Sequence, residues 1–250
     1  MLRVMTALSF TTSDGVRLAY AIEGEGWPVI LLLGFLSSGE RNWRAPGLVA
    51  ALVEAGRQVI APDARGHGAS EAPAELAAWP ADVMARDVVE LAAHLALTDY
   101  DLAGYSMGGR TAVRAVLGGL APRRLLIGGM GESAIMEAGP RAEAFEDAIR
   151  HGPEAQDAAM GEALHKAMSS QGLKPEAMLG VLASFHPTTQ AEIRGLRTHA
   201  LVLMGEDDHD NGSGQVLADW LGGRYARLPS DHSSVVAAPD FRRELLNFLN

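Results

Sequence analysis

The feature that most constrains this chain is a glycine–X–serine–X–glycine pentapeptide, Gly104-Tyr-Ser-Met-Gly108, set between two apolar segments. Residues 100–103 predict a buried strand before it, and apolar residues at helical spacing over 112–117 predict a helix after it. A serine at the tip of such a sharp turn projects above the sheet at the positive end of the helix. Glycines two residues to either side leave room where a larger side chain would clash. This pattern predicts that Ser106 is a nucleophile.

Apolar runs alternate with helical patterns along the rest of the chain. Runs typical of strands buried on both faces of a parallel sheet lie at 28–34, 58–62, 100–103, 124–128 and 200–204. Helical patterns over 47–56 and 83–95 separate some of them, and such alternation indicates right-handed crossovers in a parallel sheet. Asp14-Gly15 between two alternating segments predicts that the sheet starts with an antiparallel hairpin.

Five motifs in one order make the chain resemble the α/β-hydrolase family over nearly its whole length. They are Leu31-Leu-Leu-Gly-Phe35, Asp63-Ala-Arg-Gly-His-Gly-Ala-Ser70, Gly104-Tyr-Ser-Met-Gly-Gly109, Leu201-Val-Leu-Met-Gly-Glu-Asp-Asp208 and Pro229-Ser-Asp-His232. The resemblance implies an α/β fold: a mostly parallel eight-stranded sheet with helices on both faces and an inserted helical cap. It divides the chain into a core of residues 1–130 and 191–250 and a cap of residues 131–190.

A catalytic triad follows from the order of the motifs. In this fold the partners run serine, acid, histidine along the chain, which selects Ser106, Asp208 and His232. By resemblance, the acid is the third residue after the glycine that ends its strand, so Asp208 is favoured over its neighbours. Some family members carry the acid one strand earlier, where Glu132 is the alternative candidate.

Two backbone N–H groups are expected to form an oxyanion hole. One belongs to Met107, directly after the nucleophile, and the other lies in the loop after the third strand. The resemblance assigns the second donor to Phe35. The family usually has a histidine before the glycine of this loop, and this sequence has Leu33, which leaves the geometry of the loop open.

The proposed cap is expected to consist of helices over 137–150, 154–168 and 175–183. Five of the ten methionines lie between residues 130 and 178, which is consistent either with a pliable apolar pocket wall or with packing of the helices on the core. Candidate pocket residues are Leu36, Met130, Met136 and His186. Basic residues such as Arg141 are spread among many acids, so no carboxylate-binding clamp is predicted.

Composition sets outer limits on function. With 250 residues and 48% hydrophobic content, one sizeable domain with an insertion is expected. The formal charge of −10 and only two lysines disfavour nucleic acid and anionic membranes as partners, leaving a small-molecule substrate. There is no cysteine, no H-E-x-x-H motif and no complete G-x-G-x-x-G after a strand, so no metal and no cofactor are expected. No apolar segment of signal-peptide or membrane-spanning length is present, and we expect a cytoplasmic protein.

These features together predict a serine hydrolase acting on carboxylic esters or lactones of small to medium, largely apolar compounds. Two other possibilities remain open at this stage. One is different chemistry on the same triad, either C–C bond hydrolysis or acyl transfer to an acceptor such as peroxide. In C–C hydrolases of this family, asparagine often precedes the nucleophile. This chain has Tyr105 at that position, which disfavours C–C hydrolysis. The other possibility is a non-catalytic small-molecule receptor.

Overall fold

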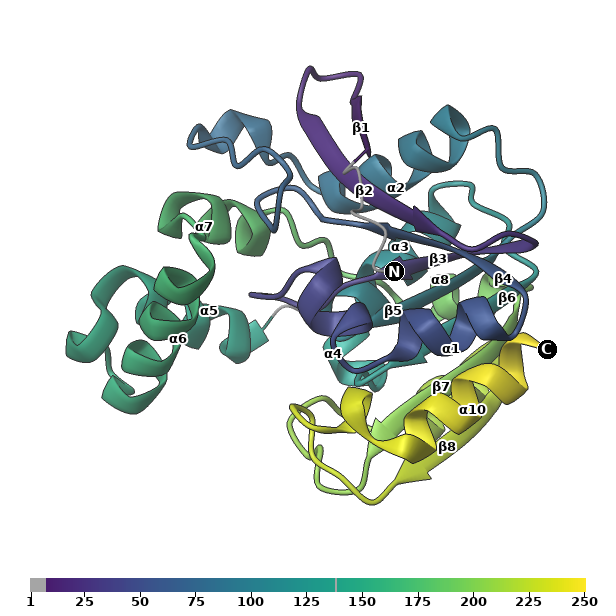
Figure 1. Ribbon diagram of the computed structural model, residues 1–250. Coiled ribbons are helices and arrows are strands. Elements are labelled where there is room, and N and C mark those ends of the chain that lie inside the picture. Colours follow the sequence, from purple (N-terminus) through teal and green to yellow (C-terminus); the bar gives the residue numbers. More distant parts are fainter. Residues whose placement is uncertain (1–7, 138) are drawn as a thin grey trace.

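An eight-stranded sheet forms the centre of the computed structural model, which describes residues 8–137 and 139–250 (Figure 1). The strand order is β1-β2-β4-β3-β5-β6-β7-β8. β2 pairs antiparallel with β1 and β4, and every other neighbouring pair is parallel. The predicted fold class, a mostly parallel eight-stranded sheet with an antiparallel start, is confirmed.

Of the eight strands, five coincide with the apolar runs of the sequence, two form the predicted hairpin, and the last, Arg224–Leu228, matches no apolar run. The strands are β1 (Leu8–Thr11), β2 (Arg17–Glu23), β3 (Trp27–Leu32), β4 (Arg57–Pro62), β5 (Asp101–Tyr105), β6 (Arg124–Gly128), β7 (His199–Gly205) and β8 (Arg224–Leu228). All five residues of β5 are buried, which explains why that segment shows no alternation of apolar and polar residues.

Ten α-helices connect or flank these strands within the described residues. They are α1 (Leu48–Glu54), α2 (Val83–His94), α3 (Met107–Leu117), α4 (Glu132–Met136), α5 (Gly139–His151), α6 (Ala158–Gln171), α7 (Pro175–Ala183), α8 (Gln190–Gly195), α9 (Gly214–Leu221) and α10 (Pro239–Leu249). Short helical turns occur at Glu40–Arg44, Leu76–Ala78, Gly152–Glu154 and Val235–Ala237.

Two apolar clusters fill the space between the sheet and the helices on its faces. Successive residues of one strand alternate between them: Ile30 belongs to the cluster that includes residues of α2, α3, α8 and α9, whereas Val29 and Leu31 belong to the one that includes residues of α1 and α10. All three side chains are fully buried, and each contributes roughly 1.5–3 kcal/mol to folding relative to exposure. The two clusters hold the sheet in place between its helices. They therefore also position the carboxyl ends of the parallel strands, from which the loops project.

A third apolar cluster joins helices α5 to α7 to the carboxyl edge of the sheet. Leu33, directly after β3, and Met107, the first residue of α3, pack there with Ile149, Met168 and Met178. These helices form the green group beside that edge in Figure 1. α6 begins at residue 158, later than predicted, because the turn at Gly152–Glu154 intervenes and the carboxylate of Asp157 accepts a hydrogen bond from the N–H of Met160.

The helices at the two ends of the predicted cap pack on the core. Ile135 of α4 lies in the same cluster as α3, and Ile193 of α8 lies there with Leu217 of α9. α8 starts with a capping box in which Thr189 and Glu192 satisfy each other's backbone N–H groups. Among the helices in the described part of the chain, α5 to α7 lie away from the two faces of the sheet (Figure 1), and the division of the chain into core and cap stays a prediction.

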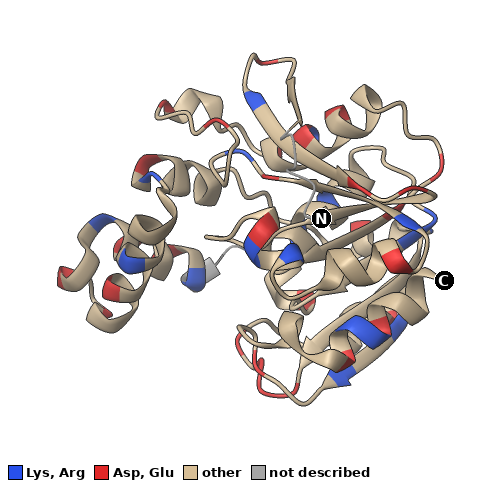
Figure 2. Cartoon of the chain, in the orientation of Figure 1, with Lys and Arg blue, Asp and Glu red and all other residues tan. Residues whose placement is uncertain are grey.

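Charged residues of both signs are interspersed over the described surface (Figure 2). On α10, for example, acidic and basic side chains occur within one helix, and Arg243 pairs with Asp240. Within residues 8–137 and 139–250, no helix is long and apolar enough to cross a membrane.

Candidate active site

Ser106 lies at the tip of the turn that joins β5 to α3. Its backbone has φ 53° and ψ −119°, a conformation that residues with a side chain rarely adopt. A Cβ atom on Gly104 would stand 2.1 Å from the carbonyl oxygen of Gly108, and one on Gly108 would stand 2.1 Å from the carbonyl oxygen of Leu32. Both glycines of the pentapeptide are therefore required for the turn to pack against β3.

His232 and Asp208 reach Ser106 from loops at the same edge of the sheet. The Nε2 atom of His232 is 3.0 Å from the hydroxyl oxygen of Ser106, and its Nδ1 atom is 2.7 Å from Oδ2 of Asp208. Asp208 follows β7 and is 7% exposed. The structure thus brings together the three residues that the order of the motifs selects, in one chain of hydrogen bonds.

The other candidate carboxylates have different environments. Glu132 accepts a hydrogen bond from the backbone N–H of Ser213, at the start of α9, and is occupied there. Asp207 and Asp210 are exposed. Of these groups, Asp208 is the one whose oxygen lies within hydrogen-bond distance of the imidazole ring of His232.

Asn211 extends the chain of hydrogen bonds beyond Asp208. Its amide Nδ2 donates to Oδ1 of Asp208 at 2.5 Å, and its Oδ1 accepts from Nη1 of Arg141 at 2.6 Å. Asn211 is 4% exposed. Sequence reasoning missed it, because an asparagine in a polar loop carries no local signal of a buried contact.

Tyr105 holds the loop that carries His232. Its hydroxyl donates to the backbone carbonyl oxygen of His232, and its ring centroid is 5.3 Å from that of the imidazole. Burial, together with the nearby carboxylates of Asp208 and Asp231, raises the pKa of Tyr105 well above its ordinary range. The phenol is therefore a permanent donor. In the sequence, only the position of Tyr105 directly before Ser106 indicated that this residue lies near the site.

The loop after β3 is held by hydrogen bonds to both sides of Phe35. The N–H of Gly34 donates to Oδ1 of Asn42 at 2.9 Å, and the N–H of Leu36 donates to Nε2 of His67 at 3.3 Å. Among the described residues, the backbone N–H groups of Phe35 and Met107 have no protein acceptor. The two predicted donors are thus free, while their neighbours are engaged.

His67 takes over the support of this loop in a chain that has Leu33 where the family has histidine. Nδ1 of His67 donates to the backbone oxygen of Arg65 at 3.1 Å, which leaves Nε2 as an acceptor. Complete burial lowers the pKa of His67 to about 4, so the ring is neutral. Leu33 itself is buried in the apolar cluster below α5 to α7.

A cavity of about 220 Å³ opens beside Ser106. Its apolar wall includes Phe35, Met107, Met130, Phe145, Leu182 and Phe185. Four charged residues also line it: Arg110, Glu137, Arg141 and Asp210. Arg110 is 6% exposed and lies on α3, one turn after the serine. The sequence shows no cluster of basic residues, so it did not indicate that two arginines would line the cavity.

Only one of the four candidate pocket residues lines this cavity. Met130 does, whereas Leu36, Met136 and His186 do not. Leu36 packs against the cluster below α5 to α7, Met136 packs against the core under α3, and His186 is exposed. Residue type and sequence context suggested these three residues, and neither fixes the direction in which a side chain points.

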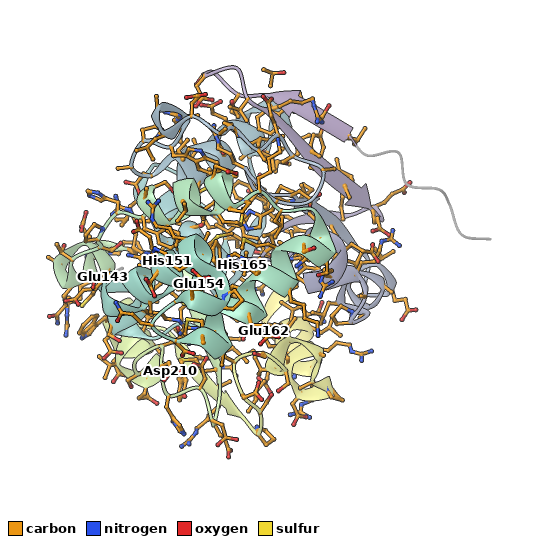
Figure 3. All side chains as sticks on the ribbon, turned by 90° about the vertical axis from the view of Figure 1, so that its left-hand side faces the viewer. Glu143, His151, Glu154, Glu162, His165 and Asp210 are labelled. Atoms are coloured by element: carbon orange, nitrogen blue, oxygen red, sulfur yellow. The ribbon has the colours of Figure 1, made fainter. Side chains whose placement is uncertain are left out.

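The outer surface of the helices beside the cavity carries several carboxylates, together with the basic residues Arg150 and Lys166. Figure 3 looks onto α5 and α6 and labels Glu143, Glu154 and Glu162 there, with Asp210 below them. All four side chains are exposed. Over residues 8–137 and 139–250, no group of three or more His, Cys, Asp or Glu side chains could hold a metal ion.

Comparisons with known proteins agree with this geometry. Residues 28–119 match the family described as the alpha/beta hydrolase fold. A non-heme chloroperoxidase from Kitasatospora aureofaciens is 37% identical over 106 residues, which are 42% of this chain and 37% of that protein. The alignment thus spans well under two thirds of the relative's length.

Solved structures match over the whole chain. A hydrolase from Pseudomonas aeruginosa PA01 has a TM-score of 0.81 at 23% identity, with all of both chains covered. The enol-lactonase from Burkholderia xenovorans LB400 has a TM-score of 0.72 at 25% identity, covering 97% of this chain and 99% of that one. The first likeness shows the shared fold.

Proposed function

We propose that this chain, which belongs to the α/β-hydrolase family, is a serine hydrolase that cleaves carboxylic esters or lactones. The observation that carries the proposal is the hydrogen-bonded chain from Asp208 through His232 to the Ser106 hydroxyl, beside two unpaired backbone N–H groups. A nucleophile, a base, a group that orients the base and donors for an oxyanion are the parts that acyl transfer needs.

The chemistry follows from these positions. His232 accepts the hydroxyl proton as the oxygen of Ser106 attacks the carbonyl carbon, and Asp208 stabilises the imidazolium. The N–H groups of Phe35 and Met107 donate to the oxyanion of the tetrahedral intermediate. The intermediate collapses, the C–O bond to the leaving group breaks, and His232 returns the proton to the departing alkoxide. Water, deprotonated by His232, attacks the acyl-enzyme, and the acid is released as Ser106 is reprotonated.

Small to medium substrates with apolar parts suit the cavity. Its volume of about 220 Å³ and its aromatic and aliphatic wall favour burial of a compact acyl or ring group. Helices α5 to α7 act as the cap in this proposal, since Phe145 of α5 and Leu182 of α7 contribute to that wall. The enol-lactonase and the esterases among the solved structures with this fold support ester or lactone chemistry.

A fluorophosphonate probe tests the nucleophile. We expect one label per chain, and peptide mapping should place it on Ser106 and not on Ser133, which lines the same cavity. Ser106→Ala should abolish labelling and lower turnover of 4-nitrophenyl esters by about 10⁴-fold or more. Ser169→Ala, an exposed serine on α6, serves as the matched control and should behave as wild type. Turnover that survives in Ser106→Ala would refute the proposal.

A second outcome for the acyl-enzyme is attack by peroxide instead of water. The likeness to the non-heme chloroperoxidase favours testing it. In that reaction hydrogen peroxide attacks the acyl carbon, the bond to Ser106 breaks, and a peracid leaves. Added hydrogen peroxide should then yield peracid in proportion to ester consumed, and Ser106→Ala should yield none. Ester consumption with no peracid would leave hydrolysis as the only activity.

A further inference from the structure

Arg110 carries a buried charge beside Ser106, and no carboxylate in the described part of the chain forms an ion pair with it. It is 6% exposed and lines that cavity together with Phe35 and Ser106. Within the described residues, its Nε and Nη2 atoms have no hydrogen-bond partner, and it forms no ion pair. Its remaining contacts are Nη1 to the backbone oxygen of Glu137 at 3.3 Å and the ring of Phe185, 4.9 Å from Cζ.

The two unpaired nitrogens form the edge of a guanidinium that binds a carboxylate side-on. Two other arginines of this chain show the arrangement. Arg65 donates from Nε and Nη2 to the two oxygens of Asp87, at 2.9 and 2.8 Å. Arg114, one turn further along α3, donates from the same two atoms to Asp82, at 2.8 and 2.5 Å. Arg110 has the same edge and no such partner.

Burying this edge without a counter-charge is unfavourable. Desolvation, together with the positive charge of Arg114, lowers the pKa of Arg110 to about 10, and the group remains charged at neutral pH. The cavity also contains Glu137 and Asp210, yet neither forms an ion pair with Arg110. A buried charge is commonly paired, and Arg binds carboxylates with two parallel hydrogen bonds.

We infer that the substrate carries a carboxylate, which Arg110 binds side-on while Ser106 attacks the ester or lactone carbonyl. This inference rests on the proposed function and narrows its substrate class. Ser106 and Arg110 are four positions apart in the sequence, and both line the same cavity of about 220 Å³. The carboxylate therefore lies a few bonds from the scissile carbonyl, as in a half-ester of a short dicarboxylic acid or a carboxylated lactone.

The inference includes a small rearrangement at the binding edge. Both unpaired nitrogens of Arg110 are covered by protein atoms. Phe185 lies over the guanidinium and also lines the cavity, and it is half-buried. Rotation of this ring would admit the carboxylate while keeping an apolar surface against the rest of the substrate.

Paired substrates test the inference. The probes are the mono-4-nitrophenyl esters of succinic, glutaric and adipic acid, each compared with the neutral 4-nitrophenyl ester of equal chain length. For at least one spacer, we expect wild-type kcat/KM to favour the anionic ester by tenfold or more. Arg110→Gln should lower kcat/KM for that ester by about 10- to 100-fold more than it lowers kcat/KM for the neutral ester. Arg110→Lys, which keeps the charge, should recover part of the loss.

Controls separate the possible failures. Arg150→Gln removes an exposed arginine that pairs with Glu146, and it should leave both substrates unchanged. If Arg110→Gln slows neutral and anionic esters equally, the residue has only a structural role and the inference is overturned. If neutral esters are cleaved and no half-ester is preferred, the inference fails while the proposed function stands. If Ser106 neither labels nor turns over any ester, the proposed function itself fails.

Discussion

Replacing Arg110 with methionine should stabilise the protein, although it removes a residue that we place in the substrate site. Methionine has a similar length and no charge, so it fills the same space below Phe185 without the cost of desolvation. A residue whose role is ligand binding commonly lowers the stability of the folded protein, whereas a residue whose role is structural does not. The sign of the change in unfolding free energy therefore distinguishes the two roles.

The magnitude follows from the environment of the guanidinium. Burial, together with the charge of Arg114, lowers the pKa of Arg110 to about 10, and at 1.36 kcal/mol per pKa unit this shift corresponds to about 3 kcal/mol against the charged form. Arg110 is only 6% exposed, so solvent screening reduces this little. The variant also loses the hydrogen bond to the Glu137 oxygen and the contact with Phe185, together about 1–2 kcal/mol. The net expectation is a gain of about 1–2 kcal/mol.

Urea unfolding at pH 7.5 measures this change, as long as the slope m is equal in both proteins. A gain of about 1 kcal/mol should appear in thermal unfolding as a rise in Tm of about 2–4 °C for a chain of this size. Arg150→Met, on the exposed side of α5, is the matched control and should change stability by less than about 0.5 kcal/mol. If Arg110→Met is less stable than wild type by 1 kcal/mol or more, the guanidinium is held by favourable contacts, and the reasoning about an unpaired charge is refuted.

Three further predictions concern the residues around the serine. Asp208→Asn should lower ester turnover by about 10³- to 10⁴-fold, whereas Asp207→Asn should cost less than tenfold; steady-state kinetics showing the reverse would exclude Asp208 as the partner of His232. Tyr105→Phe removes the donor to the backbone oxygen of His232, and kcat should fall by about tenfold with KM nearly unchanged; wild-type kcat would show that the loop holds itself. Because the folded protein protonates His67 only near pH 4 and the unfolded chain near pH 6.5, the wild type should lose about 2 kcal/mol between pH 7.5 and pH 5 through this residue. In urea unfolding, the stability of His67→Gln should fall by about 2 kcal/mol less than that of the wild type over this pH range. Equal losses of stability in the variant and the wild type would contradict the burial of a neutral His67.

The amino-acid sequence determined those features that depend on neighbours along the chain. Continuous apolar runs indicated the parallel strands, Asp14-Gly15 indicated the hairpin, and the glycines around Ser106 indicated the turn, because steric limits and side-chain periodicity act over a few residues. The order of the motifs also selected Asp208 and His232, since one family resemblance carried their relative positions.

Only the tertiary structure decided which side chains converge on the cavity. Arg110 looks in the sequence like the polar face of a surface helix, yet the carboxyl-edge helices bury it beside Ser106. Asn211 and His67 become neighbours of the site through loops that the sheet order brings to one edge. His186 and Met136, two other candidates for the cavity wall, do not line it. The physical reason is that the contacts of a side chain depend on strand register and helix packing between distant segments, and local periodicity carries no record of either.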